Sequence, residues 1–168
     1  MRTISRGALI ERLRRELVIA KYARNSEDIT TNPDAVMTGP MVCLINEQSM
    51  SDGDLFPYQF HTLGLGPLIG KRTWGGVIGI YGSLPLLDGS SVNRPEVANF
   101  GANGEWVLED VGMKPDMEID NDPYLEYIGK DQQLDKGIEV ILDLIKTNKK
   151  TKLPQRPPFP NKKQDFGK

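Results

Sequence analysis

Apolar residues return at helical spacing in two stretches of the chain. Over residues 5–24, leucine, isoleucine and alanine recur every three or four positions, with arginine and glutamate on the remaining faces. This pattern predicts an amphipathic helix, and Ser5 suits its N-cap. The same spacing over residues 134–145 predicts a second amphipathic helix.

Shorter apolar runs between these helices predict strands. Residues 25–40 are rich in Asn, Asp, Thr, Pro and Gly and predict a loop, which ends before a buried strand at 41–45. Between residues 64 and 80 glycines interrupt the apolar pieces, a pattern typical of short strands and of turns where backbones approach closely. Residues 97–100 and 106–108 predict a further pair of strands.

Two polar patterns complete the prediction of strands. Asp88-Gly89, flanked by residues 84–87 and 90–92, is a strong signal for a hairpin with a two-residue turn. Over residues 116–120 polar and apolar positions alternate, as in a half-exposed edge strand whose charges discourage pairing with another chain. A calcium loop is the alternative for these acidic residues, but the glycine that such a loop needs for its turn is absent.

The sequence Ser51-Asp52-Gly53 lies between the predicted strand at 41–45 and an apolar pattern that suits a helix. A hydroxyl at this junction faces unpaired backbone N–H groups and the positive end of the helix dipole, which favour a developing negative charge. The position therefore suits a serine nucleophile, although a serine before Asp-Gly is far more often a helix cap. The neighbouring Ser49 is interpreted as a supporting hydroxyl.

Composition sets the outer limits. The chain has 168 residues, which is the length of one globular domain, and it contains one cysteine. Its net charge of −2 gives no indication of nucleic acid as a partner. Cys43 is expected to be buried as a small hydrophobic residue. No apolar run reaches the roughly 18 residues of a membrane span, and none resembles a signal peptide. We predict a domain at 1–147 and a basic, proline-rich tail at 148–168, extended or disordered.

Three motifs carry a resemblance to a known family. They are the segment 46–54 around Ser51, the segment 65–76 ending in Arg-Thr-Trp-Gly-Gly, and the Glu-x-x-Gly-x-x-Pro-Asp sequence that begins at Glu109. Together they resemble the catalytic core of the tail-specific, or C-terminal processing, serine peptidases of the tricorn type. The resemblance implies an α/β fold of crotonase-like stacked strands and helices, and a peptide or protein substrate. It also implies no cofactor, a homo-oligomer in the intact parent, and a cytoplasmic location.

The resemblance also assigns roles to residues. It makes Ser51 the nucleophile and the backbone N–H of Asp52 one donor of the oxyanion hole, which agrees with the placement of that N–H in a first helical turn. Glu109 becomes the carboxylate that orients or polarises the histidine side of a relay. Because Glu109 follows an apolar run, we expect it at a strand end.

The sequence departs from the family's pattern in the general base, the histidine that would accept the proton of the serine hydroxyl. The one histidine, His61, follows Ser51 by roughly 10 residues of predicted helix, about 15 Å along the axis, which is beyond hydrogen-bond reach. His61 is therefore interpreted as a surface or packing residue. The place of the family's glycine-rich oxyanion segment is taken by residues 1–4, which contain no glycine. We expect a C-terminal part of a larger peptidase, incomplete at its N-terminus and inactive without the missing N-terminal part.

Two other readings remain. The chain is alternatively a non-catalytic subdomain that binds peptides or subunits through exposed strand edges and its basic tail. A crotonase-type acyl-CoA enzyme is the third reading, against which the Ser51-Asp52-Gly53 match argues. Asp52 and Asp54 lack the partners of a metal site, so no metal is expected. Lys71 and Arg72 suit either a structural loop, which we favour, or a site for a carboxylate or phosphate. Gly75 and Gly76 could let a peptide backbone approach closely.

The missing part also affects stability. Without it, the apolar faces of the first helix and of the strand at 41–45 lack cover, and such a patch favours association. The isolated chain is therefore not expected to be a well-behaved monomer.

Overall fold

A three-stranded parallel sheet lies at the centre of the structure. The computed structural model describes residues 6–147 and 153–159, and its central strands are β3 (Cys43–Ile45), β4 (Leu68–Gly70) and β7 (Met117–Glu118). They are ordered β3-β4-β7, and both pairs are parallel. The predicted buried strand at 41–45 is thus confirmed in a shorter form, and the predicted edge strand at 116–120 is confirmed as β7.

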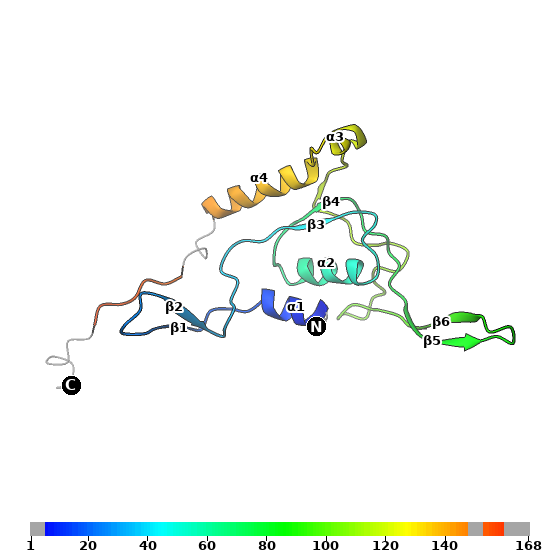
Figure 1. Ribbon diagram of the computed structural model, residues 1–168, viewed down its shortest axis with the longest axis horizontal. Coiled ribbons are helices and arrows are strands. Elements are labelled where there is room, and N and C mark those ends of the chain that lie inside the picture. The colour runs from blue at the N-terminus through cyan, green and yellow to red at the C-terminus, as the bar shows by residue number, and fades with distance from the viewer. Residues whose placement is uncertain (1–5, 148–152, 160–168) are drawn as a thin grey trace.

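Helices cover both faces of this sheet, so the chain has a mixed α/β fold (Figure 1). On one face lies α2 (Asp52–Thr62), with α1 (Arg6–Leu13) packed behind it. On the other face lies α4 (Gln132–Thr147), which confirms the second predicted helix. The helix predicted to begin at Ser51 is confirmed as α2.

Two apolar clusters form the core, one toward each end of α2. The first cluster joins α1, α2 and the sheet, and its buried members are Ile10, Ile45, Phe60 and Leu68. The second cluster joins α2 to the segments before and after the β5–β6 hairpin described below. Its buried members are Leu55, Val77 and Leu108. Cys43 is only partly buried and packs against the first cluster, and this burial raises the pKa of its thiol to about 11. The second cluster lies beside Ser51.

Helix α4 is attached near its N-terminus. The Gln133 side-chain amide donates to the carbonyls of Ile45 and Ile69, at 2.7 and 2.8 Å, and Gly137 lies against Leu44. Along the length of the helix an apolar stripe remains about half exposed, made of Leu134, Ile138, Leu142 and Ile145. Leu9 of α1 and Leu44 of β3 are also exposed, but Ile10 and Ile45 of the same two elements are buried, so the predicted lack of cover is found only at single side chains.

The first predicted helix is wrong beyond Leu13. Residues 19–22 form strand β1 (Ile19–Tyr22), which pairs antiparallel with β2 (Ile29–Asn32) inside the predicted loop. Both strands contain β-branched residues, whose branched side chains suit an extended backbone, and their cross-strand pairing outweighs the helical periodicity. Ser5, the predicted N-cap, lies outside the described residues.

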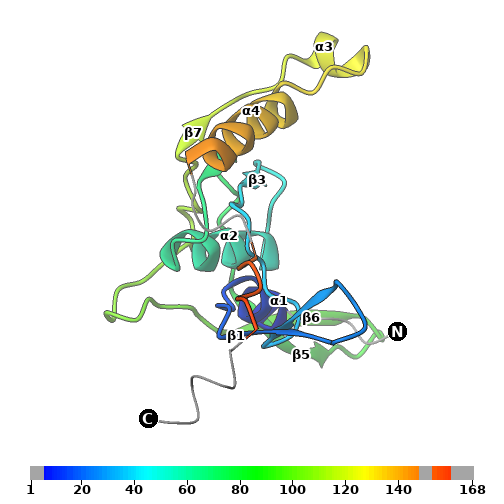
Figure 2. The same cartoon turned by 90° about the vertical axis from the view of Figure 1, so that its left-hand side faces the viewer.

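A second hairpin projects from the molecule. Strands β5 (Gly79–Pro85) and β6 (Ser91–Val97) pair antiparallel around the predicted Asp88-Gly89 turn and extend away from the helices (Figure 1). Figure 2 shows the hairpin at the level of α1, below α2. The predicted two-residue turn is wrong in length: the Leu86 N–H donates to the Ser90 carbonyl, so the loop has three residues, and Gly89 has the positive φ that this turn requires. The other predicted strand pair, 97–100 with 106–108, is reduced to one bridge between Phe100 and Trp106.

Two features of the C-terminal region differ from the prediction. A short helix that we missed, α3 (Pro123–Tyr127), begins after Asp122, whose side chain accepts the N–H groups of Tyr124 and Leu125. Asp before Pro is a recognisable start signal for a helix.

In the predicted tail, residues 153–159 are extended, and Arg156 lies 4.9 Å from the Tyr22 ring. Residues 148–152 and 160–168 lie outside the described residues. In the part of the chain that the structure describes, no helix is long and apolar enough to cross a membrane.

Candidate active site

Ser51 occupies a strained turn at the start of α2. The Gly53 N–H donates to the Met50 carbonyl at 2.7 Å, which closes a tight turn, and Ser51 has φ 56° and ψ −110°. Glycine normally takes this position, because a Cβ crowds the backbone there. The Ser51 side chain makes no capping hydrogen bond and the residue is exposed. Ser51 thus occupies the N-cap position of α2, but its side chain does not cap the helix.

Ser49 holds the loop before this turn. Its hydroxyl accepts the Asn46 N–H at 3.2 Å and lies 3.4 Å from the Asn46 side-chain oxygen, while its own N–H donates to the Asn46 carbonyl. Its carbonyl accepts the Trp74 N–H at 2.9 Å. Ser49 is thus a structural residue of the loop, as predicted, and leaves Ser51 as the outward hydroxyl.

Residues 73–77, which we name the strap, run beside the Ser51 turn. The Ser51 N–H donates to the Gly76 carbonyl at 3.1 Å, and the Gly75 N–H donates to the Asp54 carboxylate at 2.8 Å. Gly75 has φ 91°, and a Cβ on it would lie 2.7 Å from the Gly112 nitrogen. The structure therefore explains Gly75 by close packing within the chain.

Glu109 lies in a turn, so its predicted place at a strand end is wrong. The residues on either side, Leu108 and Asp110, both have positive φ, at 72° and 62°. Three backbone contacts within 107–112 and the bond from the Asp110 N–H to the Gly75 carbonyl over-determine this strained turn. Glu109 is half-buried, and its Oε2 accepts the Val77 N–H at 2.8 Å.

One peptide unit connects Ser51 to Glu109. The Gly76 carbonyl accepts from Ser51, and the Val77 N–H of the same peptide donates to Glu109. In a trans peptide these two groups point in opposite directions, so the serine and the carboxylate lie on opposite sides of it. The structure thus brings the two predicted residues into one neighbourhood, on the two sides of the Gly76–Val77 peptide.

Asp52 is the first residue of α2, so its backbone N–H lies in the first helical turn beside Ser51. This is the end of the helix dipole that favours negative charge. Asp54, two residues on, is fully buried. Within residues 6–147 and 153–159 the structure contains no group of three or more His, Cys, Asp or Glu side chains arranged to hold a metal ion.

His61 lies in the last turn of α2, at the opposite end of the helix from Ser51. Its Nε2 is 3.1 Å from Asp116 Oδ1, and the side chain is 45% exposed. The other oxygen of Asp116 accepts the Leu68 N–H at 2.7 Å. His61 is therefore a surface residue, as predicted, and it is separated from Ser51 by the length of the helix.

Lys71 and Arg72 act within the chain, which confirms the favoured reading of a structural loop. Lys71 Nζ lies 3.0 Å from Glu47 and 3.2 Å from Asp120, and hydrogen bonds to these two carboxylates raise the pKa of Lys71. Arg72 donates to the carbonyls of Trp74 and Val111. Both side chains tie the ends of the parallel strands to neighbouring loops.

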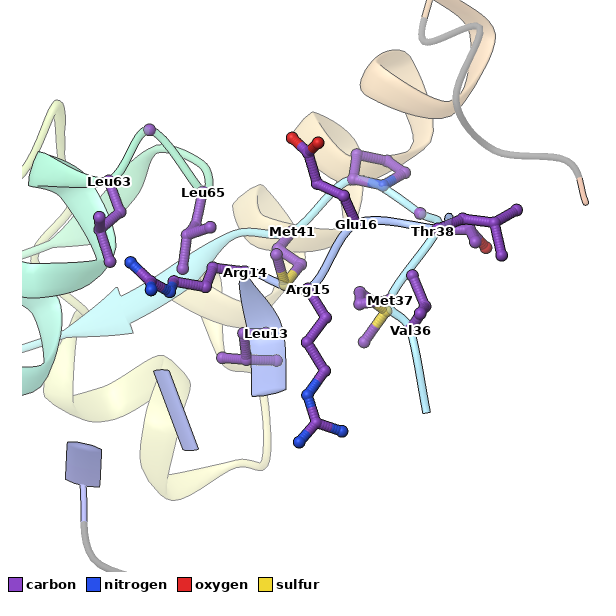
Figure 3. A pocket seen from close by; sticks show the side chains of 14 residues that line it. Leu13, Arg14, Arg15, Glu16, Val36, Met37, Thr38, Met41, Leu63 and Leu65 are labelled. Atoms are coloured by element: carbon purple, nitrogen blue, oxygen red, sulfur yellow. The ribbon is translucent and has the colours of Figure 1, made fainter. Parts of the chain in front are cut away.

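A hollow on the surface of the chain lies away from these residues. It has a volume of about 730 Å³ and lies between the end of α1, residues 36–41 and the loop after α2. In Figure 3, Leu13, Met41 and Leu65 lie in this hollow, while the Arg15 side chain extends away from them. Neither this hollow nor a smaller one beside α4 is lined by Ser51, Asp52 or Glu109. The candidate site is therefore an exposed surface on this chain.

The geometry is that of a strained, outward serine at a helix start, with a carboxylate placed across one peptide. The sequence pattern of peptidase family S41 matches residues 7–119, a stretch that contains all of these groups. The chain belongs to this family, which is one of serine peptidases.

Relatives within the family are tricorn proteases. Over 125 residues the chain is 40% identical to the tricorn protease of Thermoplasma acidophilum, covering 74% of this chain and 12% of that protein. Over 136 residues it is 38% identical to a Sulfurisphaera tokodaii protein named as a tricorn-like protease C-terminal subunit, covering 81% and 16%. A crystal structure of tricorn protease superposes with a TM-score of 0.78 at 34% identity, covering 84% and 14%. The chain thus spans about one seventh of the length of these proteins.

Proposed function

We propose that this chain is the nucleophile-bearing section of a serine peptidase that cleaves peptide bonds through an acyl-enzyme at Ser51. The observation that carries the proposal is the Ser51 turn, in which a non-glycine residue has φ 56° and its exposed hydroxyl caps nothing. Strain of this kind persists only where surrounding contacts hold it, and it concentrates at functional sites. A serine on a sharp turn at a helix start is a recurrent way of presenting a nucleophile.

In the proposed reaction, Ser51 Oγ attacks the carbonyl carbon of the substrate peptide bond and its proton passes to a base. The Asp52 backbone N–H donates to the oxyanion that forms, which costs no reorganisation because the helix already fixes its direction. The base then gives the proton to the leaving amine, and water hydrolyses the acyl-enzyme. No metal or cofactor takes part in this scheme.

The base is proposed to come from the rest of a larger protein. The one histidine of this chain, His61, is held at the far end of α2 by Asp116. Glu109 lies across the Gly76–Val77 peptide from Ser51, which supports a role in orienting a base and not in direct activation of the serine. The relative named as a C-terminal subunit supports a division of such a peptidase between chains.

Several features of the whole protein remain part of this proposal. We propose that residues 1–147 complete a crotonase-like domain together with the missing N-terminal part, and that residues 148–168 form a separate tail. We also propose that the intact peptidase is a cytoplasmic homo-oligomer acting on peptides. The mixed α/β fold and the likeness to tricorn protease support these statements.

The test is covalent labelling of Ser51 by a fluorophosphonate. The chain alone is expected to label slowly, and the chain with an added upstream segment that carries the base is expected to label fast. Ser51→Ala should abolish labelling, a loss of about 10⁴-fold or more. Ser49→Ala is the matched control, since that hydroxyl is engaged with Asn46. Slow labelling with the upstream segment present, or labelling that survives Ser51→Ala, would overturn the proposal.

A second function is favoured by the exposed apolar stripe of α4 and by the projecting β5–β6 hairpin. Surfaces of this kind mark interaction sites. In this reading the chain is a non-catalytic module that binds peptides or subunits. It predicts that the upstream segment binds the chain without creating any reactivity at Ser51, so the labelling experiment separates the two functions.

A further inference from the structure

Asp54 is a buried carboxylate that the proposed mechanism leaves without a role. The residue is fully buried, and its Oδ1 accepts the Gly75 N–H at 2.8 Å. Its Oδ2 is buried with no hydrogen-bond partner among the described residues. Burying a carboxylate is costly unless its bonds repay the loss of water, so this position demands an explanation.

The bond from Gly75 to Asp54 joins α2 to the middle of the strap. On one side of Gly75, the Trp74 N–H donates to Ser49, and on the other side the Gly76 carbonyl accepts from Ser51. Asp54 therefore fixes the strap between its two contacts with the nucleophile loop. Because Asp54 lies three residues after Ser51 in the same helix, the turn and its support share one rigid element.

The strap has little freedom to be held in another way. Gly75 is packed against the 108–112 turn, and its own carbonyl accepts the Asp110 N–H at 2.8 Å. Without an acceptor at position 54, the Gly75 N–H would be left buried and unpaired, which favours a shift of the strap. Such a shift would move the Gly76 carbonyl from Ser51 and the Val77 N–H from Glu109 together.

We propose that Asp54 is a positioning residue for Ser51. Its carboxylate holds the strap, and the strap holds both the strained backbone of Ser51 and the carboxylate of Glu109. Asp54 itself touches no reacting atom. The inference rests on the proposed function for its consequence on reactivity, while the structural link from Asp54 to Ser51 stands on the hydrogen bonds alone.

The experiment compares three variants in the full chain with the upstream segment added. Asp54→Ala removes the acceptor, and Asp54→Asn keeps an oxygen for Gly75 but removes the charge. Asp116→Ala is the matched control, because Asp116 also accepts a backbone N–H across the fold, from Leu68, at the other end of α2. The measurements are the fluorophosphonate rate constant and affinity at Ser51, the hydrogen exchange of the Ser51 amide, and the melting temperature.

Asp54→Ala is expected to lower the maximal labelling rate about 10- to 100-fold at unchanged probe affinity, and to speed exchange of the Ser51 amide. Asp54→Asn should restore both to near the wild-type values. Asp116→Ala should lower the melting temperature without changing the labelling rate. The split between rate and affinity, and between the two carboxylates, is not expected from a general loss of stability.

Several results would overturn the inference. They are wild-type labelling in a folded Asp54→Ala, equal losses in Asp54→Ala and Asp116→Ala, or a large loss in Asp54→Asn. Asp54→Asn decides the matter if Asp54→Ala fails to fold. Absence of labelling in the wild-type chain would instead count against the proposed function, and the exchange of the Ser51 amide would still test whether Asp54 holds it.

Discussion

The Ser51 turn and the β5–β6 hairpin are both made of short segments joined by tight turns, and the chain supports them differently. The Ser51 turn is held by the strap, by Asp54 and by a core cluster that includes Leu55 and Val77. The hairpin projects into solvent, and the described residues of β6 are all exposed. A two-stranded hairpin is marginally stable by itself. The comparison indicates that the Ser51 turn is held by contacts within this chain, whereas the hairpin is held by the pairing of its own two strands.

The comparison predicts its largest effect on stability for leucines, since a core leucine should contribute much more to the free energy of unfolding than a hairpin leucine. Leu68 is fully buried in the first core cluster, while Leu87 at the hairpin tip is fully exposed. Leu68→Ala is expected to lower the free energy of unfolding by about 2–5 kcal/mol, through lost burial and a cavity. Leu87→Ala should change it by less than about 0.5 kcal/mol. Urea unfolding of the isolated chain measures both, and a large effect at Leu87 would show that the hairpin packs in solution.

Two glycines allow the same comparison for backbone packing, one of them beside residues 73–77 and the other in an open loop. Gly112 and Gly104 both have positive φ, but a Cβ on Gly112 would lie 2.2 Å from the Thr73 carbonyl, while one on Gly104 would meet open space. Gly104→Ala is expected to cost about 1 kcal/mol from the left-handed backbone alone. Gly112→Ala should cost roughly 2 kcal/mol more, because the strap must move. Thermal unfolding of both variants is the measurement, and equal costs would mean that the strap is loose.

Cys43 gives a pH-dependent test of the first core cluster, against which it packs. Burial raises the pKa of its thiol from 9.0 to about 11 in the folded chain. At pH 8 the thiolate fraction is then about a hundredfold lower than in the unfolded chain, so iodoacetamide should react about a hundredfold more slowly. The raised pKa also means that the thiol favours the folded state below pH 9, and that this contribution is lost as the pH rises toward 11. Fast alkylation at pH 8 would show that this part of the core opens.

The smallest effect is expected at the contact between the tail and the β1–β2 hairpin. Arg156 lies 4.9 Å from the ring of Tyr22 and 5.0 Å from that of Phe159. Arg156→Ala should lower stability by about 0.5–1 kcal/mol, the range of an exposed cation–π contact. Arg156→Lys, which keeps the charge, is the control. The chemical shifts of the Tyr22 ring protons report the contact directly, and unchanged shifts in Arg156→Ala would show that the tail does not lie there in solution.

Local features of the sequence predicted much of the fold. Helix α4, the start of α2 at Ser51-Asp52-Gly53, the turn at Asp88-Gly89 and the edge strand β7 all follow from patterns within a few residues. Each depends on periodicity, a helix start or turn chemistry, which neighbouring residues determine. Strands β1 and β2 were missed because each is four residues long and is stabilised by its partner.

The Ser51-Asp52-Gly53 sequence by itself determined where the candidate nucleophile is, because the strand-to-helix change and the family motifs are local. Only the tertiary structure decided that Ser51 has a strained backbone and caps nothing, and that Glu109 lies across the Gly76–Val77 peptide from it. These features depend on hydrogen bonds between residues 21 to 35 positions apart, such as Gly75 with Asp54 and Asp110 with Gly75. Contacts at such separations are chosen by packing of the whole chain, so no short pattern reveals them.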